Sequence, residues 1–301
     1  MKNLWLLLPF LLSLLQASGQ ASRHALPIQL KKNLILIEVG VNAGPPMTFV
    51  FDTGAGVTVI DRKAAHKLGL AITGAGRLAT SGKSVSSHTS YPNSLHLGGI
   101  TLPDISLDII SIQHLSDYLG HELDGVIGYD LLKTYVVEAN IDSMQMRLYK
   151  ALPGGPGPAA LALEVIPMEF NHFGLELSVR PGKRSDVLSL PFKVDTAFED
   201  LLVIHNPTLQ KYSLLKGKKY KELRGFGAES TITTNYQGKF REVMLGGRSW
   251  KNVSCIFEVD PISIAARKNS QAAGLIGQEL LLEFNITYDL PAGKIYLEDR
   301  G

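Results

Sequence analysis

Short segments that are apolar or alternate between apolar and polar residues recur along the chain, each bounded by Gly, Pro, Asn or Asp. Clear examples are residues 34–41 (LILIEVGV), 47–52 (MTFVFD), 135–142 (YVVEANID) and 284–290 (FNITYDL). Short segments of this kind with turn residues at their ends are typical of β-strands. Helical patterns are few, with DRKAAHKLGL at residues 61–70 the longest. The pattern therefore predicts a mainly β protein with few short helices.

A segment rich in Pro and Gly, residues 152–161 (LPGGPGPAAL), interrupts this pattern near the middle of the chain. Because this composition suits neither helix nor strand, we interpret the segment as a linker. We predict an N-terminal lobe over residues 20–152, a linker over residues 153–160 and a C-terminal lobe over residues 161–301. Residues 1–19 are set apart as a signal peptide.

The two predicted lobes repeat one another in sequence. FVFDTGAGVTVI around Asp52 returns as FKVDTAFEDLLVI around Asp195. HLGGITLPDISL returns as MLGGRSWKNVSC, and DGVIGYDLLKTYVVEANIDSMQMRLY returns as AGLIGQELLLEFNITYDLPAGKIYL. The repeated motifs keep their order and nearly their spacing. We interpret the chain as a duplicated β unit whose two copies pack about an approximate two-fold axis.

Asp52 is a single acidic residue within an otherwise apolar stretch that runs to residue 60. Burying a charge is costly unless the charge is paired or its protonation has a function. If the two units pack about a two-fold axis, Asp52 and Asp195 meet near that axis. Two carboxylates a few ångströms apart do not both ionise easily, so such a pair holds one proton over a wide pH range.

This arrangement resembles the pepsin-type aspartic proteases, whose bilobal form consists of two retropepsin-like units. The resemblance is carried by two triplets and two later glycines: Asp52-Thr53-Gly54, Asp195-Thr196-Ala197, Gly128 and Gly277. It implies two homologous β-barrel-like lobes related by a pseudo-two-fold axis. It also implies that Asp52 and Asp195 are catalytic, that Thr53 and Thr196 hydrogen-bond across the dyad, and that Gly54 and Ala197 support it.

The implied function is that of an aspartic endopeptidase acting on a peptide or protein substrate without a cofactor. The ionised carboxylate is the general base on a water molecule, and the protonated one donates to the scissile carbonyl and then to the leaving amine. Because the pKa values belong to the pair, neither role is assigned to one aspartate.

Three positions depart from the family pattern. Ala197 replaces the usual glycine of the second triplet, and Ala55 and Phe198 stand where a small hydroxyl residue is usual. Loss of a hydrogen bond to a carboxylate raises its pKa. We therefore expect an activity optimum less acidic than that of a gastric enzyme.

The candidate for the flap that covers the substrate is the hairpin at residues 77–87 (RLATSGKSVSS), which turns at Ser81, Gly82 and Lys83. It has no aromatic residue. The corresponding hairpin of the second repeat, residues 224–231, contains Phe226.

Two other functions stay open. One is a non-catalytic peptide-binding pseudoprotease of the same fold, whose second motif has drifted at Ala197 and Phe198. The other is a self-processing or highly selective protease with a single natural substrate.

Charge and composition exclude other classes. The net charge of +2 gives no reason to expect a nucleic-acid partner. Cys255 is the only cysteine, so no intramolecular disulfide forms. The eight histidines are scattered singly without a metal-binding motif, so no metal is predicted. A monomer is the simplest expectation, because both halves of the site are already joined in one chain.

The first residues are typical of an export signal. Lys2 precedes the apolar segment 4–15 (LWLLLPFLLSLL), and small residues follow at residues 17–19. This apolar segment is short for a bilayer span and contains Pro9, so no stable membrane anchor is predicted. We expect a periplasmic or extracellular protein.

Overall fold

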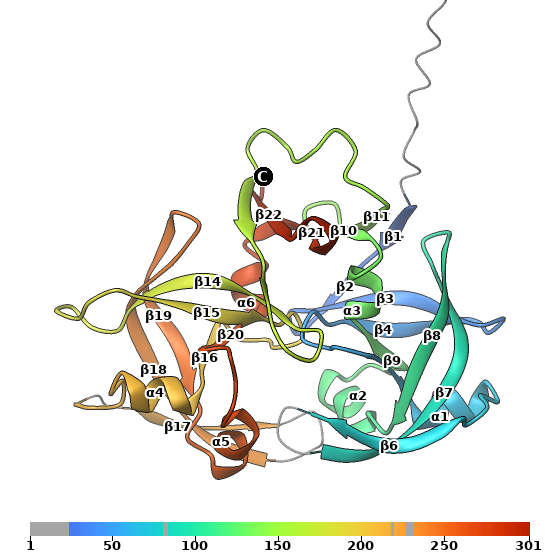
Figure 1. Cartoon of the computed structure of the whole chain (residues 1–301), viewed down its shortest axis with the longest axis horizontal. Helices are drawn as coiled ribbons and strands as arrows, with labels where there is room; N and C mark the ends of the chain where they lie inside the picture. The colour runs from blue at the N-terminus through green and yellow to red at the C-terminus, as the bar shows by residue number, and fades with distance from the viewer. Residues whose placement is uncertain (1–23, 81–83, 218–219, 227–231) are drawn as a thin grey trace, which may run out of the picture.

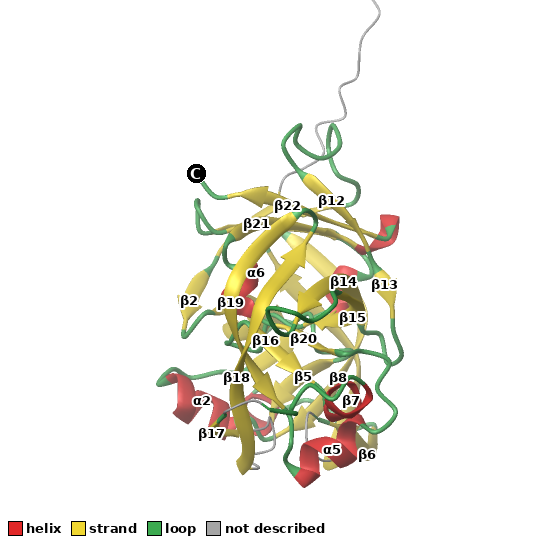
Figure 2. Cartoon of the chain, turned by 90° about the vertical axis from the view of Figure 1, so that its left-hand side faces the viewer, coloured by secondary structure: helices red, strands yellow, loops and turns green. Residues whose placement is uncertain are grey.

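The computed structural model describes residues 24–80, 84–217, 220–226 and 232–301 (Figure 1). The predicted signal peptide lies outside these residues. Within them, no helix combines the length and the apolar character that crossing a membrane requires. Strands dominate the described residues, and the helices between them are short (Figure 2). The mainly β fold expected from the sequence is confirmed.

One sheet is built from the N-terminal half of the chain. Its strands, in spatial order among the described residues, are β2 (Gln29–Lys31), β3 (Leu34–Val41), β4 (Pro46–Phe51), β9 (Gly125–Ile127), β5 (Thr58–Asp61), β8 (Ile100–Ile110), β7 (Ser84–Leu97) and β6 (Gly74–Ala79). β3 also pairs with β7, so the sheet folds back on itself. Three short helices belong to this half: α1 (Arg62–Lys67), α2 (Gln113–Leu119) and α3 (Tyr129–Leu132).

A second sheet repeats the first, strand by strand. Its described strands, in spatial order, are β13 (Ile166–Pro167), β14 (Phe173–Arg180), β15 (Leu188–Val194), β20 (Gly274–Ile276), β16 (Leu202–Ile204), β19 (Arg248–Phe257), β18 (Ile232–Leu245) and β17 (Lys221–Phe226). β14 also pairs with β18, as β3 does with β7. The helices of this half are α4 (Asn206–Lys211), α5 (Pro261–Arg267) and α6 (Gln278–Leu281). The two sheets lie on opposite sides of the molecule in Figure 1.

A third sheet joins the two halves and has no counterpart in the sequence-based prediction. Its described strands, in spatial order, are β1 (His24–Pro27), β11 (Gln145–Tyr149), β10 (Val136–Asn140), β21 (Phe284–Asp289), β22 (Lys294–Asp299) and β12 (Leu161–Glu164). The halves meet where β10 pairs with β21. The single 3-10 turn of the described residues, η1 (Leu290–Ala292), connects β21 to β22. The predicted linker runs between β11 and β12, above the sheet in Figure 1.

Paired glycines form the equivalent hairpin turns of the two halves. Gly98 and Gly99, between β7 and β8, have φ angles of 55° and 78°, and Gly246 and Gly247, between β18 and β19, have φ angles of 57° and 87°. A two-residue turn whose twist matches that of the strands needs positive φ at both positions, which glycine adopts without steric cost. The sequence echo LGG is therefore a repeated turn.

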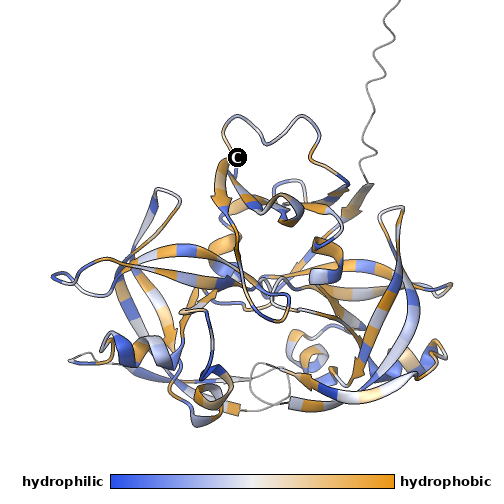
Figure 3. Cartoon of the chain, in the orientation of Figure 1, coloured by the Kyte–Doolittle hydropathy of each residue, from blue (hydrophilic) through white to orange (hydrophobic). Residues whose placement is uncertain are grey.

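The core follows the alternation seen in the sequence. Apolar and polar residues alternate along β14 and β15 (Figure 3), and the apolar side chains of β14 are buried. The main buried cluster contains residues from both halves. Phe51 of β4, for example, packs edge-to-face on Tyr288 of β21 with ring centroids 5.7 Å apart. Such burial contributes roughly 2 kcal/mol per large side chain, so the halves stabilise one another.

The close packing around β20 gives a test of the fold. A Cβ atom added at Gly274 would overlap the carbonyl oxygen of Val203 and lie 2.8 Å from Cε1 of Phe192. We expect Gly274→Ala to destabilise the protein by about 3 kcal/mol, measured by urea unfolding, because the strands cannot move apart cheaply. Gly76→Ala is the control, since nothing lies within 4 Å of its added Cβ. Equal unfolding midpoints for the two variants would contradict the packing described.

Candidate active site

Asp52 and Asp195 occupy equivalent places in the two halves. Asp52 directly follows β4, and its N–H donates to the carbonyl of Ile127 at 2.9 Å. Asp195 directly follows β15, and its N–H donates to the carbonyl of Ile276 at 3.0 Å. β9 and β20 thus run parallel to β4 and β15 and fix the ends of these strands. Each half therefore presents one aspartate at the end of a buried strand.

The glycines that follow β9 and β20 hold the two aspartate loops in place. A Cβ at Gly128 would overlap the carbonyl oxygen of Asp52, and one at Gly277 would overlap the carbonyl oxygen of Asp200. Only a residue without a side chain permits this approach. In each half, the glycine of the apolar-apolar-Gly motif noted in the sequence thus packs directly against the backbone of the aspartate loop.

Thr53 and Thr196 interlock the two loops. The N–H of Thr53 donates to Oγ1 of Thr196 at 2.9 Å, and the N–H of Thr196 donates to Oγ1 of Thr53 at 3.1 Å. Each hydroxyl then donates to the opposite half: Thr53 to the carbonyl of Val194 at 3.0 Å, and Thr196 to that of Phe51 at 2.8 Å. Both side chains are buried, and each hydroxyl is used as donor and acceptor.

The two carboxylates border the same glycine. Oδ1 of Asp52 accepts from the N–H of Gly54 at 2.7 Å, and Oδ1 of Asp195 accepts from the N–H of Ala197 at 3.2 Å. A Cβ added at Gly54 would lie 2.5 Å from Oδ2 of Asp195. The structure thus brings together all six residues of the two predicted triplets.

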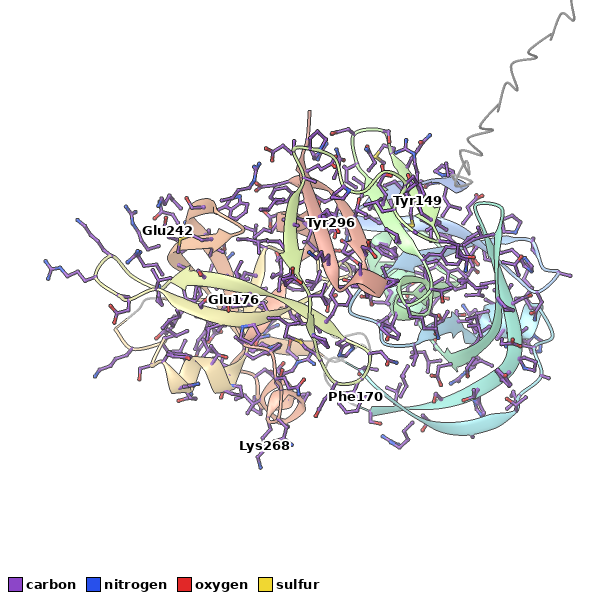
Figure 4. All side chains as sticks on the ribbon, turned by 45° about the horizontal axis from the view of Figure 1, so that its top comes forward. Tyr149, Phe170, Glu176, Glu242, Lys268 and Tyr296 are labelled. Carbon is purple, nitrogen blue, oxygen red and sulfur yellow. The ribbon has the colours of Figure 1, made fainter. Side chains whose placement is uncertain are left out.

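Two asparagines, one from each half, support the aspartate loop of the other half. Nδ2 of Asn33 donates to the carbonyl of Glu199 at 3.3 Å, and Nδ2 of Asn171 donates to that of Gly56 at 3.0 Å. Glu199 and Gly56 are each the fourth residue after an aspartate. The asparagines follow Lys32 and Phe170 in tight turns with positive φ at both positions, and Phe170 is exposed at the tip of its turn (Figure 4). Sequence reasoning missed these contacts. The available signal was an asparagine in the turn shortly before the strands β3 and β14, at equivalent places in the two halves.

Comparisons with known proteins relate part of the chain to one family. Residues 37–131, which include the first triplet, match the family model described as aspartyl protease. Through this segment, which is about a third of the chain, the protein is similar to the aspartyl protease family. No curated protein matches the chain.

The fold of the whole chain is also found among solved structures. The crystal structure of aspartic proteinase from Irpex lacteus is similar over 92% of this chain and 97% of that chain, with a TM-score of 0.56 and 14% sequence identity. At this identity the likeness shows the fold alone. The pepsin-type fold expected from the sequence is confirmed.

Asp52 has an unusual titration. It keeps some solvent contact, yet protein surrounds the carboxyl, and this burial raises the pKa of Asp52 to about 7. The negative charge of Asp195 acts in the same direction, whereas Lys193 and the N–H groups of Gly54 and Ala55 oppose it. Burial, rather than the missing hydroxyl considered above, is the main cause. A carboxyl that holds its proton near neutral pH is suited to general acid catalysis there.

Lys193 and His172 lie beside the dyad and were not found from the sequence. Nζ of Lys193 lies 3.4 Å from Oδ2 of Asp195 and donates to the carbonyl of Gly54 at 3.2 Å. Burial, followed by the charge of Lys193, lowers the pKa of His172 to about 4. The sequence did contain a signal for Lys193. The repeat aligns it with Val50, so a charged residue stands where the first half has an apolar one.

The predicted flap residues Ser81, Gly82 and Lys83 lie outside the described residues. The strands on either side of them pair as a hairpin, with Ala79 opposite Ser84. Among the residues that the structure does describe, no group of three or more His, Cys, Asp or Glu side chains could hold a metal ion.

The threonine interlock gives a prediction about stability. We expect Thr196→Val to destabilise the protein by about 2–4 kcal/mol in urea unfolding, because it leaves the buried N–H of Thr53 and carbonyl of Phe51 without these partners. Thr196→Ser keeps the hydroxyl and should cost about 1 kcal/mol or less. If the two variants unfolded at the same urea concentration, the interlock would not have the role described.

The raised pKa of Asp52 gives a prediction about pH. A carboxyl whose pKa is higher in the folded than in the unfolded state favours folding below its unfolded pKa, and that contribution is lost as pH rises to the folded value. Asparagine does not ionise, so the Asp52→Asn variant does not lose stability in this way as the pH rises. The free energy of unfolding of the variant relative to the wild type should therefore rise between pH 4 and pH 8, by up to about 4 kcal/mol. A difference that did not change with pH would show that Asp52 has the same pKa in the folded and unfolded states, and so that its pKa is not raised.

Proposed function

We propose that the protein is an aspartic endopeptidase in which Asp52 and Asp195 hydrolyse a peptide bond. The observation that carries this proposal is the position of both carboxylates against Gly54, one from each half, each with one oxygen held by a backbone N–H. The match of residues 37–131 to the aspartyl protease model supports a peptide or protein substrate. The proposal needs no cofactor.

The chemistry follows from sharing one proton between two carboxylates. The ionised carboxylate accepts a proton from water as the water oxygen adds to the scissile carbonyl carbon. The protonated carboxyl donates its proton to the carbonyl oxygen, so no separate charge develops on that oxygen. Collapse of the tetrahedral intermediate then breaks the C–N bond while the nitrogen receives a proton. The N–H groups of Gly54 and Ala197 hold the carboxylates in position for both steps.

Ala197 is compatible with this chemistry. Its N–H donates to Asp195 as the N–H of Gly54 does to Asp52, and its side chain packs against an apolar cluster that includes Leu36 and Val50 of the first half. The methyl group therefore has a place outside the pair of carboxylates.

Peptide binding without hydrolysis is the second candidate function, and one observation favours it. The ammonium of Lys193 beside Asp195 stabilises negative charge at the dyad. If both carboxylates were ionised at the working pH, no proton would be available for the carbonyl oxygen.

The test is cleavage of a denatured protein and of an unbiased peptide mixture between pH 4 and pH 7.5. We expect Asp52→Asn and Asp195→Asn each to lower the cleavage rate by about 100-fold or more. A statine-type transition-state mimic should inhibit the wild type, because it copies the tetrahedral intermediate. Asp104→Asn, at an exposed position of β8, makes the same chemical change away from the dyad and should leave the rate unchanged.

Two outcomes would contradict the endopeptidase. Cleavage that survives in both dyad variants would place the catalytic residues elsewhere. Saturable peptide binding with no cleavage at any pH, in protein that is folded by circular dichroism, would favour the peptide-binding module.

A further inference from the structure

Lys193 is a nearly buried cation with two partners, both at the dyad. It lies on β15, two residues before Asp195, and its side chain is 11% exposed. Its Nζ lies 3.4 Å from Oδ2 of Asp195 and donates to the carbonyl of Gly54 at 3.2 Å. Lysine is rarely buried without a paired charge, because taking an ammonium out of water is costly. The pairing with Asp195 offsets this cost.

This contact breaks the symmetry between the two halves. The residue of the first half that corresponds to Lys193 is Val50, which is 3% exposed and packs in an apolar cluster. Asp195 therefore has a cation at ion-pair distance and the N–H of Ala197. Among the described residues, no cation lies within 4 Å of the Asp52 carboxylate.

The other titratable and charged groups near this pair do not replace Lys193. His172 faces Lys193 and Asp195 from the turn before β14, but its pKa is lowered to about 4, so it is neutral over most of the relevant pH range. His205 is buried, which lowers its pKa, and it is bonded to Glu258 at 2.6 Å. The positive charge of Arg267, in α5, also lowers the pKa of both histidines.

We propose that Lys193 is a positioning residue that fixes the negative charge of the dyad on Asp195 and the shared proton on Asp52. This inference rests on the proposed endopeptidase function and assigns the two roles that the pair alone leaves open. Asp195 is then the general base and Asp52 the general acid. The burial of Asp52, which raises its pKa, acts in the same direction.

With these roles the proton balance of hydrolysis closes. Asp195 takes a proton from water as the water oxygen bonds to the carbonyl carbon, and the proton of Asp52 passes to the carbonyl oxygen, which gives a neutral gem-diol. When the C–N bond breaks, Asp195 returns its proton to the leaving nitrogen, and one gem-diol hydroxyl gives its proton to Asp52. The products are a carboxylic acid and an amine, and the dyad regains its starting state.

The test locates the proton directly. The purified protein is labelled with ¹³C at the aspartate carboxyl carbons and titrated from pH 9 to pH 4 by NMR, with the two signals assigned from Asp52→Asn and Asp195→Asn. In the wild type we expect Asp52 to gain a proton first, while Asp195 keeps the chemical shift of a carboxylate through that step. Protonation of Asp195 first, or of both together, would overturn the proposal.

Variants at position 193 separate charge from packing. In Lys193→Met we expect the Asp195 signal to begin to move during the first protonation, and that protonation to shift upward by about one pH unit, because a nearby positive charge is lost. Lys193→Arg, which keeps the charge, should retain the separate titrations. Lys239→Met removes an exposed lysine of β18 and is the matched control. A Lys193→Met titration identical to that of the wild type would overturn the role of Lys193.

Activity distinguishes this proposal from the function on which it rests. If the wild type cleaves peptides, both limbs of its pH–rate profile should move upward in Lys193→Met and return toward the wild type in Lys193→Arg. A wild type with separate titrations but no cleavage would refute the endopeptidase and leave the proton assignment in place. Cleavage by the wild type, together with unaltered titrations in Lys193→Met, would support the endopeptidase and refute the role of Lys193.

Discussion

The reciprocal hydrogen bonds between Thr53 and Thr196 are the constraint on which the rest of the site depends. Each hydroxyl accepts from the backbone of the opposite half and donates to a carbonyl of that half. Because all of these groups are buried, a small displacement of one half would leave several of them without a partner. Two carboxylates that repel one another are thus held together by neutral groups whose bonding is complete only in one arrangement.

The surrounding fold supplies this constraint in layers. The pairing of β10 with β21 joins the halves at one end, far from the hairpins β6–β7 and β17–β18 in Figure 1. Asn33 and Asn171 then connect each half to the aspartate loop of the other. The strand pairing is shared by the two halves and the asparagine contact occurs once in each, so both halves fix the position of one aspartate relative to the other.

The sequence revealed those features that are local and repeated. The apolar strand before each aspartate, the paired glycines of the hairpins and the glycines at positions 128 and 277 each have a short-range signature, and the repeat made them specific. The joining sheet could not be predicted, because it pairs β10 with β21, strands far apart in the sequence, and strand pairing leaves no local mark. Lys193 was missed for another reason: a lysine in a strand normally points to solvent, whereas this one is buried beside Asp195, two residues later on the same face of the strand.

The departures from symmetry are concentrated in the second half, and the space around the dyad explains why. At Gly54 a methyl group would press on the carboxylate of Asp195, so the first triplet has no freedom to change. Ala197 instead directs its methyl toward apolar residues of the first half, and Phe198 lies against Gly277. Lys193, also in the second half, places a positive charge beside Asp195. A duplicated unit needs two equivalent positions to bring the carboxylates together, but the proposed hydrolysis needs an acid and a base that differ. The differences at Lys193, Ala197 and Phe198 meet both requirements, because they change the surroundings of Asp195 and leave the threonine hydrogen bonds between the halves intact.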